Sequence, residues 1–452
     1  MKYLCRMFRG MVTAICMLVS LNGSAQNPAP KILFKNATLI DGNGGAPIQN
    51  ADILIEGETI SQIGKNITSP GAKIINLSGK TVMPALASAH VHVGVIKGNE
   101  GSGKFYTREN ILSQLKKYQN YGVGNLLAMG TDRPLLFETG LRDSSVNGLL
   151  PGARMYSAGY GFNVPDASVS PDSFLGNLYR PASASEVPEM MNRLAKLKPE
   201  VVKIWVDGSA ESKMKPAVYQ SILQEAHKHN LRVLAHVYYL SDARKLVASG
   251  IDVFGHSIRD SIVDDGLIQE MKAKSIPYIP TLTLDMFAHA YAGKPDWLND
   301  TFFKASLEPG VYEMISSEKY QSDQKASADN ARSAAAFQIA LKNVKKLHDA
   351  GILIALGTDS GAFPIRAQGF AEHLEMELLV KAGLTPIEAI TVATRNAARV
   401  LKIEKSLGTI EKGKSADLVI LSSNPAGDIK NTRKIEGVYK AGREVSKGPI
   451  GR

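Results

Sequence analysis

The sequence predicts an α/β fold, a (β/α)8 TIM-type barrel joined to a small β-sandwich domain that both chain ends build. Two observations favour this fold. In the middle of the chain, amphipathic helices that end at Gly or Asn are each followed by a short strand that is apolar on both faces. At both ends, short apolar runs alternate with Asn, Gly and Pro turns. The 452 residues, 44% of them hydrophobic, suffice for one large core and a smaller companion domain.

The first segment of the chain has the three parts of a secretory signal peptide. Lys2, Arg6 and Arg9 precede an apolar run at 11–21, and a small-residue cleavage pattern ends at Ala25. A membrane anchor is the competing interpretation, but the run has roughly half of the ~20 residues that a spanning helix needs. We therefore expect cleavage after Ala25 and an exported protein, periplasmic or secreted, with no membrane anchor afterwards.

The predicted domain boundaries follow from these sequence patterns. They delimit a signal peptide at 1–25, the first part of the β-sandwich at 26–83, the barrel at 84–401 and the second part of the β-sandwich at 402–452. The first β segment contains the runs ILFKNATLI, ADILIEGETI and AKIINL. The last contains LGTIEKGKSADLVIL and IEGVYKAGREV, which have the same strand-and-turn texture.

Cysteine content and charge exclude several classes of function. Both cysteines, Cys5 and Cys16, lie inside the predicted signal peptide, so the mature chain would have no disulfide, thiolate metal site or cysteine nucleophile. Neither follows the small-residue pattern of a lipoprotein cysteine, which argues against a lipid anchor. The net charge is +10, but the 53 Lys and Arg residues are spread rather than clustered. We interpret this as a solvated basic surface and expect no nucleic-acid partner.

Four successive units show the helix-then-strand rhythm of the middle segment. They are the helix 186–198 before VVKIWV, the helix 216–229 before LRVLAHV, a helix with Ser241 as its N-cap before IDVFGHS, and a helix ending at Gly351 before ILIALGTDS. A barrel and an open doubly wound sheet both satisfy this pattern. The polar residues that chemistry needs fall at the C-terminal ends of strands, as in a barrel, and we find no glycine-rich phosphate loop.

Five of these polar residues predict a metal centre. His90 and His92 stand two apart in TVMPALASAHVHVG, so both side chains point to one face and can bind one metal ion. His236 in VLAHVYY and His256 in VFGHSIR end consecutive strands, one β/α step apart. Asp359 in ALGTDSG could bind a metal and accept a proton from its bound water. Any one of them could simply cap a helix or bond a loop, but five at strand ends favour a shared site.

Lys203 is the unusual member of this set. It lies in the middle of the apolar strand VVKIWVDG, where a charged amine is costly to bury. A surface lysine that reaches water is the alternative, but the strand has the pattern of one buried on both faces. A neutral amine can take up carbon dioxide to form a carbamate, whose two oxygens could bridge two metal ions.

Together these motifs resemble the amidohydrolase superfamily, and within it the imidazolonepropionase-like and metal-dependent dipeptidase-like branch. The resemblance covers nearly the whole mature chain, including HLEMELLVKAGLTPIEAITVATRNAARVL near the C-terminus. It implies two divalent metal ions, which we expect to be zinc. One would be held by His90, His92 and Asp359, the other by His236 and His256, with carboxylated Lys203 as the bridge. It also implies that a bridging hydroxide attacks the substrate carbonyl and that Asp359 passes the proton to the leaving nitrogen.

Two features depart from the family pattern. Ala85 and Ser88 stand where relatives have Gly and Asp before the histidine pair, which removes a polar group beside the ligands but no ligand. The loop SAGYGFNVP lacks the histidine that many relatives use to contact substrate, so Tyr160 or Asn163 would have to substitute.

Further residues are candidates for substrate binding. Tyr238 and Arg259 follow two of the ligand histidines closely and together could hold a carboxylate, such as that of a dipeptide or N-acyl amino acid. His373, at the start of the helix after the last strand, is a further candidate. Tyrosine and arginine on barrel loops can also pack or pair locally.

The function favoured by the sequence is hydrolysis of a C–N bond in an amide, peptide or cyclic amide. The substrate would be a small molecule, and a dipeptidase is one form that this activity could take. Hydrolysis of a lactone or phosphoester on the same metals is an alternative, and so is an exported binding protein that has lost the chemistry. Mononuclear deaminase relatives resemble one another in using a glutamate that AHVYY lacks. The oligomeric state stays open, and a homo-oligomer is compatible with the sequence.

Overall fold

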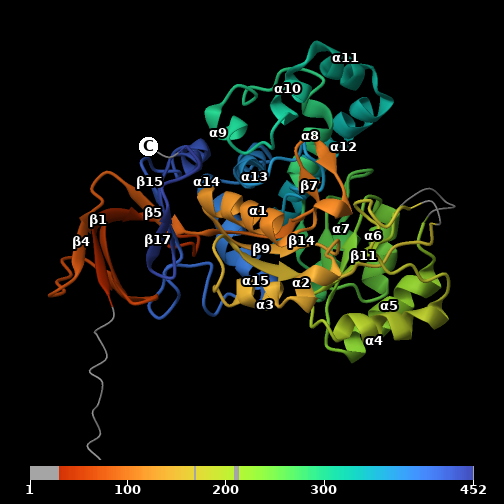
Figure 1. Cartoon of the computed structure of the whole chain (residues 1–452), viewed down its shortest axis with the longest axis horizontal. Helices are drawn as coiled ribbons and strands as arrows, with labels where there is room; N and C mark the ends of the chain where they lie inside the picture. Colours follow the sequence, from red (N-terminus) through yellow and green to blue (C-terminus); the bar gives the residue numbers. More distant parts are fainter. Residues whose placement is uncertain (1–29, 167–168, 208–212, 451–452) are drawn as a thin grey trace, which may run out of the picture.

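The computed structural model describes residues 30–166, 169–207 and 213–450. Figure 1 shows a β domain at the left, a larger body of strands and helices beside it, and a group of short helices projecting at the top. The predicted signal peptide lies outside the described residues. Among the described helices, none combines the length and the apolar character needed to cross a membrane.

Strands from both ends of the chain form one connected sheet. The N-terminal strands are β1 (Lys31–Leu39), β2 (Ile48–Glu56), β3 (Thr59–Gly64), β4 (Lys73–Asn76) and β5 (Thr81–Pro84), and the C-terminal strands are β15 (Leu418–Leu421), β16 (Ile435–Lys440) and β17 (Arg443–Ser446). Their order is β17-β16-β15-β5-β1-β2-β3, with β4 paired to β1. The two ends meet where β15 pairs antiparallel with β5. Side chains of Phe34, Ile53, Leu418 and Tyr439 share the core of this domain, whose arrangement as a sandwich stays a prediction.

Two parallel sheets form the centre of the larger body. One has the order β10-β9-β6, from β6 (Leu86–Val91), β9 (Val123–Ala128) and β10 (Arg154–Ser157). The other is β11-β12-β13-β14, from β11 (Val202–Trp205), β12 (Val233–His236), β13 (Val253–Gly255) and β14 (Tyr278–Ile279). β6 and β9 are buried along their whole length, as expected for parallel strands covered on both faces.

Isolated bridges continue the order of these strands. Phe162, which follows β10, pairs with Ile204 of β11. The predicted last strand, 352–360, is not continuous: it pairs with Tyr278 through Ile354 and with Val91 through Ser360. Its amides divide between neighbours on its two sides, with Ala355 donating to Tyr278 and Thr358 donating to His90. These contacts place the segment next to β14 and next to β6; full closure of a barrel stays a prediction.

Helices connect the parallel strands and cover them (Figure 1). Those longer than eight residues are α1 (Arg108–Asn120), α4 (Val187–Ala195), α5 (Pro216–Lys228), α6 (Leu240–Ala248), α7 (Asp265–Ala273), α8 (Leu282–Ala290), α11 (Glu318–Ala326), α12 (Ala328–Asp349) and α13 (Phe370–Lys381). Shorter ones are α2 (Pro134–Glu138), α3 (Leu141–Val146), α9 (Thr301–Lys304), α10 (Val311–Ser316), α14 (Pro386–Thr391) and α15 (Ala397–Leu401). The remaining pieces are the hairpin of β7 (Ile96–Lys97) with β8 (Glu100–Gly101), the 3-10 turns 103–105, 184–186 and 429–433, and the π-helical turn 392–396.

One predicted helix boundary is wrong. Ser241 was expected to cap the helix before β13, but α6 begins at Leu240 and its N-cap is Tyr239, which makes no side-chain capping bond. Asp260, from the next loop, supplies the cap instead, because its carboxylate accepts a hydrogen bond from the Leu240 amide at 2.8 Å. A cap donated by a residue distant in sequence leaves no local signal.

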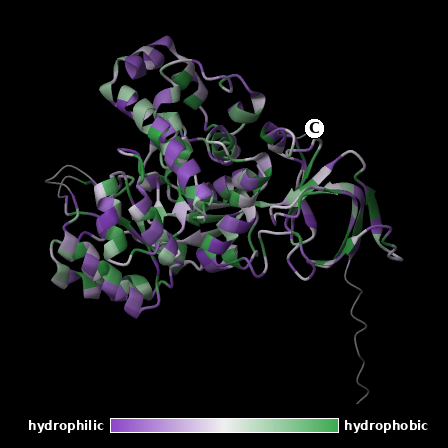
Figure 2. Cartoon of the chain, turned by 180° about the vertical axis from the view of Figure 1, so that it is seen from behind, coloured by the Kyte–Doolittle hydropathy of each residue, from purple (hydrophilic) through white to green (hydrophobic). Residues whose placement is uncertain are grey.

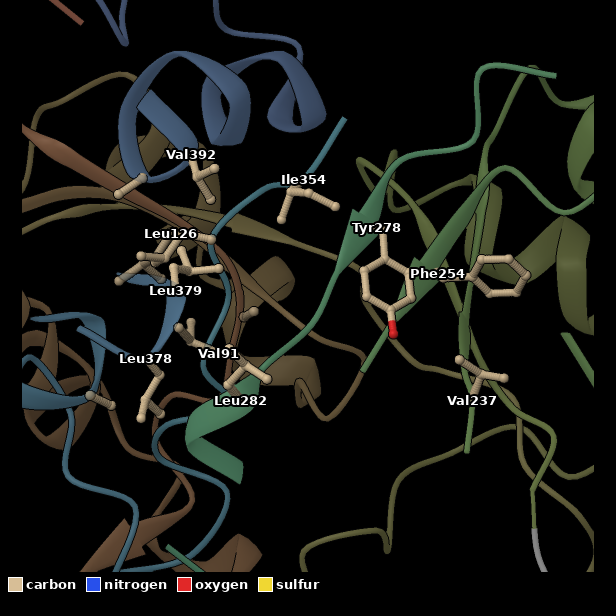
Figure 3. Close-up of a cluster of buried hydrophobic side chains, with 14 of the residues drawn as sticks. Val91, Leu126, Val237, Phe254, Tyr278, Leu282, Ile354, Leu378, Leu379 and Val392 are labelled. Carbon is tan, nitrogen blue, oxygen red and sulfur yellow. The ribbon is translucent and has the colours of Figure 1, made fainter. Parts of the chain in front are cut away.

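The hydrophobic core runs between the strands and the helices that cover them. Figure 3 shows Val91, Leu126, Phe254 and Tyr278 together with residues of α13 and of the π-helical turn. The Tyr278 hydroxyl accepts a hydrogen bond from the Ile258 amide at 2.7 Å, which satisfies its polar end in the core. In Figure 2 hydrophilic residues are frequent on the outer helices, whereas hydrophobic residues concentrate towards the strands. The core therefore fixes the ends of the strands from which the candidate ligands project.

Candidate metal centre

The strands bring the histidines predicted from the sequence close together. His90 lies at the end of β6, His236 ends β12 and His256 directly follows β13. The ring centroids are 4.4 Å apart for His90 and His256 and 4.0 Å apart for His236 and His256. The ring centroids of His90 and His92 are 5.9 Å apart. The C-terminal ends of parallel strands thus gather four imidazoles into one cluster, in which His90, His92 and His256 are buried and His236 is partly exposed.

Asp359 completes the cluster from the segment that follows the Ile354 bridge. Its Oδ1 lies 3.0 Å from Nε2 of His92 and 3.3 Å from Nε2 of His90. Its other oxygen, Oδ2, accepts a short hydrogen bond from Arg366. Burial raises the pKa of this carboxyl, but Arg366 and the two imidazoles outweigh burial and hold the pKa well below its usual value. Asp359 is therefore an anion in the cluster.

Lys203 is fully buried beside these groups. Its Nζ lies 3.4 Å from Nε2 of His90 and 5.0 Å from the centroid of the Trp205 ring. Within the described part of the chain, no carboxylate lies within ion-pair distance of the amine. Burial lowers the pKa of Lys203 to about 7, so a large share of the amine is uncharged at neutral pH. An uncharged amine is the form that can react with carbon dioxide to give a carbamate.

Threonine hydroxyls orient two of the imidazoles. Nδ1 of His92 lies 2.8 Å from Oγ1 of Thr131, and Nδ1 of His256 lies 2.7 Å from Oγ1 of Thr281. Each bond fixes one ring nitrogen and leaves Nε2 to face the cluster, the arrangement typical of histidines that bind metal ions. Burial, as the largest cause, holds the pKa of His256 well below its usual value, which keeps this imidazole neutral.

The backbone is strained at three positions around the cluster. His256, Thr281 and Asp359 all adopt the left-handed region, with φ of 74°, 48° and 57°. Residues other than glycine occupy this region at a cost of roughly 1–3 kcal/mol each when the surrounding structure demands it. All three carry side chains of the cluster or of its support: Asp359 contacts His92, and Thr281 contacts His256.

The residues present fit a metal site. Ligand atoms of His90, His256 and Asp359 all lie within 4.8 Å of one another. The Nδ1 atoms of His90 and His236 are buried and have no hydrogen-bond partner among the described residues, which is costly unless the ring is used otherwise. Nε2 of His236 instead faces Asp207 at 3.1 Å. Neutral imidazoles and a carboxylate are donors that zinc and similar divalent ions accept.

A cavity of about 420 Å³ opens beside the cluster. It is lined by Asp207, Tyr238, Arg259, Leu284, Asp285, Ala288, Asp329, Arg332, Ser333, Ala336 and Arg366. Two residues predicted to bind substrate, Tyr238 and Arg259, are therefore in its wall. Arg259 is buried and already engaged: it donates to the carbonyls of Val237 and Ser257, and its Nε lies 3.0 Å from Oδ1 of Asp285.

Other predicted substrate residues lie away from this cavity. The Tyr160 ring packs against Phe137 and Tyr179, with centroids 5.8 Å away in both cases, and burial raises its pKa to about 12. Asn163 uses its backbone amide to bond the Tyr179 carbonyl and its side-chain oxygen to accept from the next amide. Both therefore have the contacts of structural residues, and a substrate role for Tyr160 stays an untested prediction.

His373 does not line the cavity, and its ring nitrogens have other contacts. Nε2 lies 2.9 Å from the carbonyl of Tyr121 and Nδ1 lies 3.0 Å from Oγ1 of Thr432. The ring packs edge-on against Phe302, and burial lowers its pKa to about 3. The residue was expected to face substrate because it follows the last strand closely, but the first turn of α13 points it towards the C-terminal segment instead.

The sequence did not indicate several polar residues of the site. Arg366, Asp207, Asp285 and Arg332 reach the cluster or the cavity, and Thr131 and Thr281 support the imidazoles. Asp207 carried a weak local signal because it follows the strand of Lys203 at its C-terminal end. The others lie on loops or helices whose position depends on long-range packing.

A buried glutamate supports the segment that carries Asp359. Glu372 accepts hydrogen bonds from the hydroxyls of Ser88, Thr358 and Ser360 and from the amide of Gly369. In Sequence analysis, the family resemblance implied that Ser88 removes a polar group beside the ligands. The Ser88 hydroxyl nevertheless makes a polar contact here, with Glu372. Through the two neighbours of Asp359, this network fixes the backbone that presents the carboxylate.

Comparison with known proteins agrees with this geometry. A sequence profile of the amidohydrolase family matches residues 81–445. Ochratoxinase from Aspergillus niger is 26% identical over 474 residues, covering 94% of this chain and 88% of that protein. Imidazolonepropionase from Flavobacterium psychrophilum is 24% identical, covering 82% of this chain and 85% of that protein. The structure of a Xaa-Pro dipeptidase with bound methionine in its active site matches with a TM-score of 0.71 at 23% identity, covering 92% of this chain and 99% of that one.

The family profile spans most of the chain, so the predicted resemblance is confirmed at the level of the superfamily. The solved structure supports the fold, and the named relatives are enzymes. The chain therefore belongs to the amidohydrolase family and is a hydrolytic enzyme of that family.

Proposed function

We propose that this enzyme hydrolyses a C–N bond of an amide, peptide or cyclic amide at a centre of two divalent metal ions. The observation that carries the proposal is the cluster of four imidazoles, one carboxylate and one amine. All of these groups are buried except His236, which is partly exposed, and among the described residues the amine has no carboxylate within ion-pair distance. Such a donor set suits metal ions and is costly to bury without them. The named relatives include a Xaa-Pro dipeptidase and an imidazolonepropionase, which supports a C–N substrate.

The proposed ligands are those of the sequence prediction. His90, His92 and Asp359 would hold one ion, His236 and His256 the other, and a carbamate on Lys203 would bridge them. We propose zinc for both. His236 and Asp207 now face each other at 3.1 Å, so ligand binding by His236 would exchange this contact for a metal bond.

The proposal extends to architecture and location. We propose that the two parallel sheets and the segment 354–360 close into an eight-stranded barrel over 84–401, since the isolated bridges join neighbouring strands in that order. The sheet formed by 26–83 and 402–452 would curl into a sandwich around the Phe34 and Tyr439 core. Residues 1–25 would direct export.

When bound, the metal ions supply a Lewis acid for the substrate carbonyl and lower the pKa of water. The chain supplies the remaining functions. Asp359 would take a proton from the attacking water at a carboxylate oxygen and return it to the leaving nitrogen. Arg366, bonded to Oδ2, holds that carboxylate in place. The cavity beside the cluster would bind the rest of the substrate and exclude bulk water.

Hydrolysis assays on the metal-loaded protein test this function. The panel would contain dipeptides including Xaa-Pro, N-acyl amino acids and cyclic amides, with Asp359→Asn as the variant that removes the proton carrier. We expect turnover of at least one class, loss of turnover after chelation, and a fall of at least about 100-fold in kcat for Asp359→Asn. Asp323→Asn is the matched control, since Asp323 is an exposed carboxylate on α11 paired with Lys319. A fully metal-loaded protein that hydrolyses only lactones or phosphoesters would contradict the proposed bond.

A further inference from the structure

Three arginines line the cavity beside the metal centre, and two of them are already paired. Arg259 is buried, and its guanidinium faces Asp285 at 3.0 Å. Arg366 is bonded to Asp359. A substrate anion that used either arginine would have to displace an existing carboxylate. The third, Arg332, is different.

Arg332 is exposed and has no ion pair among the residues that the structure describes. Its guanidinium carbon lies over the Tyr238 ring, 5.2 Å from the centroid. A hydrogen bond with the Tyr238 side chain raises the pKa of this guanidinium. The nearest acid on its own helix is Asp329, one turn earlier, which also lines the cavity. Stacking on an aromatic face fixes the plane of a guanidinium while leaving its N–H groups largely available.

The helix that carries Arg332 is held firmly. α12 packs along α8, and both lie beside the projecting helices in Figure 1. At this end of α12, Asn330 donates to the carbonyl of His289 at 3.2 Å, and the His289 ring lies 5.3 Å from that of Phe337. Two residues from this anchor, Arg332 is presented to the cavity from a helix rather than from a loose loop.

We propose that Arg332, stacked on Tyr238, binds a free carboxylate of the substrate, and that Arg259 has a structural role in the cavity wall. This inference rests on the proposed function, because it names the substrate class: compounds in which the part leaving as an amine also carries a carboxylate, as in dipeptides and N-acyl amino acids. A planar guanidinium can donate two parallel hydrogen bonds to such a group. Leu284, Ala288 and Ala336 supply apolar wall for the side chain of that part.

Binding of a product-like pair of ligands tests the inference without depending on turnover. L-Phenylalanine and L-phenylalaninol share the amine and the aromatic side chain, and only the first has a carboxylate. Titration calorimetry with the metal-loaded protein should show at least about tenfold tighter binding of L-phenylalanine. Arg332→Met should weaken L-phenylalanine about tenfold and leave L-phenylalaninol nearly unchanged, while Arg332→Lys keeps part of the preference.

Two further variants sharpen the result. Asp329→Asn should tighten L-phenylalanine a few-fold, since it removes a like charge near the carboxylate. Arg193→Met is the matched control: Arg193 lies over the Tyr179 ring at 5.6 Å, as Arg332 does over Tyr238, but it does not line the cavity. This control should leave both affinities unchanged.

The outcomes separate this inference from the proposed function. Equal affinity for the two ligands in the unmodified protein, or a preference that survives in Arg332→Met, would overturn the role of Arg332. Hydrolysis of the amide panel could still stand in that case. A clear preference that depends on Arg332, in a protein that hydrolyses no amide, would instead leave the carboxylate site in place and remove the proposed reaction.

Discussion

Replacement of His373 by glutamine tests whether this histidine belongs to the interior or to the site. The Tyr121 carbonyl can only accept, so the proton of a neutral ring is on Nε2, and Nδ1 lies 3.0 Å from the hydroxyl of Thr432, which also lies 2.9 Å from the Ile429 carbonyl. The folded-state pKa of about 3 lies below the ordinary histidine pKa of 6.5, because the ring is buried. The unfolded chain therefore binds more protons as the pH falls below about 6.5, and the stability held by the neutral ring is lost in that range.

The size of the effect follows from the shift. Below the unfolded-state pKa of His373, the free energy of unfolding falls by roughly 1.4 kcal/mol for each pH unit. At pH 5 the native protein has therefore lost about 2 kcal/mol of stability through this residue. Glutamine can keep the bond to Tyr121 but loses the ring contact with Phe302, so we expect a loss of about 1–2 kcal/mol at pH 7.5. The variant lacks the titrating group, so the difference between the two proteins should nearly vanish at pH 5.

Urea denaturation at pH 7.5 and pH 5, followed by circular dichroism, measures both values. Bound metal per chain, measured on the same samples at pH 7.5, should be equal in the two proteins. The reasoning fails if the stability gap stays constant or widens between pH 7.5 and pH 5. Loss of metal from a His373→Gln protein that is fully folded would also refute the placement of this residue away from the centre.

Two other substitutions have sharp expectations. Gly357→Ala would place a Cβ 2.7 Å from Cβ of His90. This should lower the unfolding free energy by about 1–3 kcal/mol and reduce bound metal. Gly293→Ala is the control, because position 293 has open space around it, and it should do neither. Arg154 and Asp417 form a buried ion pair between β10 and the β domain. Arg154→Met alone should lower the free energy of unfolding, measured with urea, by about 3–5 kcal/mol because Asp417 is left buried without a partner. The double variant with Asp417→Asn should lower it by less than the sum of the two single changes.

The sequence was informative where a local pattern fixes a side chain in space. A histidine at the end of a strand buried on both faces has one direction to point, and parallel strands end on the same side. His90, His236 and His256 could therefore be expected to meet, and the structure places their rings within contact distance. The same reasoning identified Lys203, because a buried strand offers a charged amine no route to water.

Prediction failed where position depends on contacts between distant segments. Arg332 reaches the cavity only because α12 packs on α8, and nothing near it in the sequence indicates this. Arg366 is seven residues from Asp359, but the turn between them contains Gly361, which has a positive φ and lies where any side chain would collide with the His92 carbonyl. For His373, nearness to a strand end in sequence did not place the side chain in the wall of the cavity.

Carboxylation of Lys203 can be examined separately from catalysis. A protein supplied with ¹³C-bicarbonate should show a carbamate carbon signal that disappears in Lys203→Ala. Lys440 is the matched control, because burial lowers the pKa of its amine to about 8 but the amine donates to the carbonyls of Leu150 and Gly152, away from the metal centre. The signal should persist in Lys440→Ala. A signal that survives in Lys203→Ala would place the modification elsewhere.

The count of metal ions per chain bears most directly on the proposed centre. We would purify the chain from Gln26 onward, supply zinc and bicarbonate, and measure bound metal by elemental analysis in the unmodified protein, Lys203→Ala and Lys440→Ala. The expected result is close to two ions per chain, a sharp fall in Lys203→Ala and no change in Lys440→Ala. Metal near zero in the folded, unmodified protein, even with zinc and bicarbonate supplied, would contradict the binuclear centre.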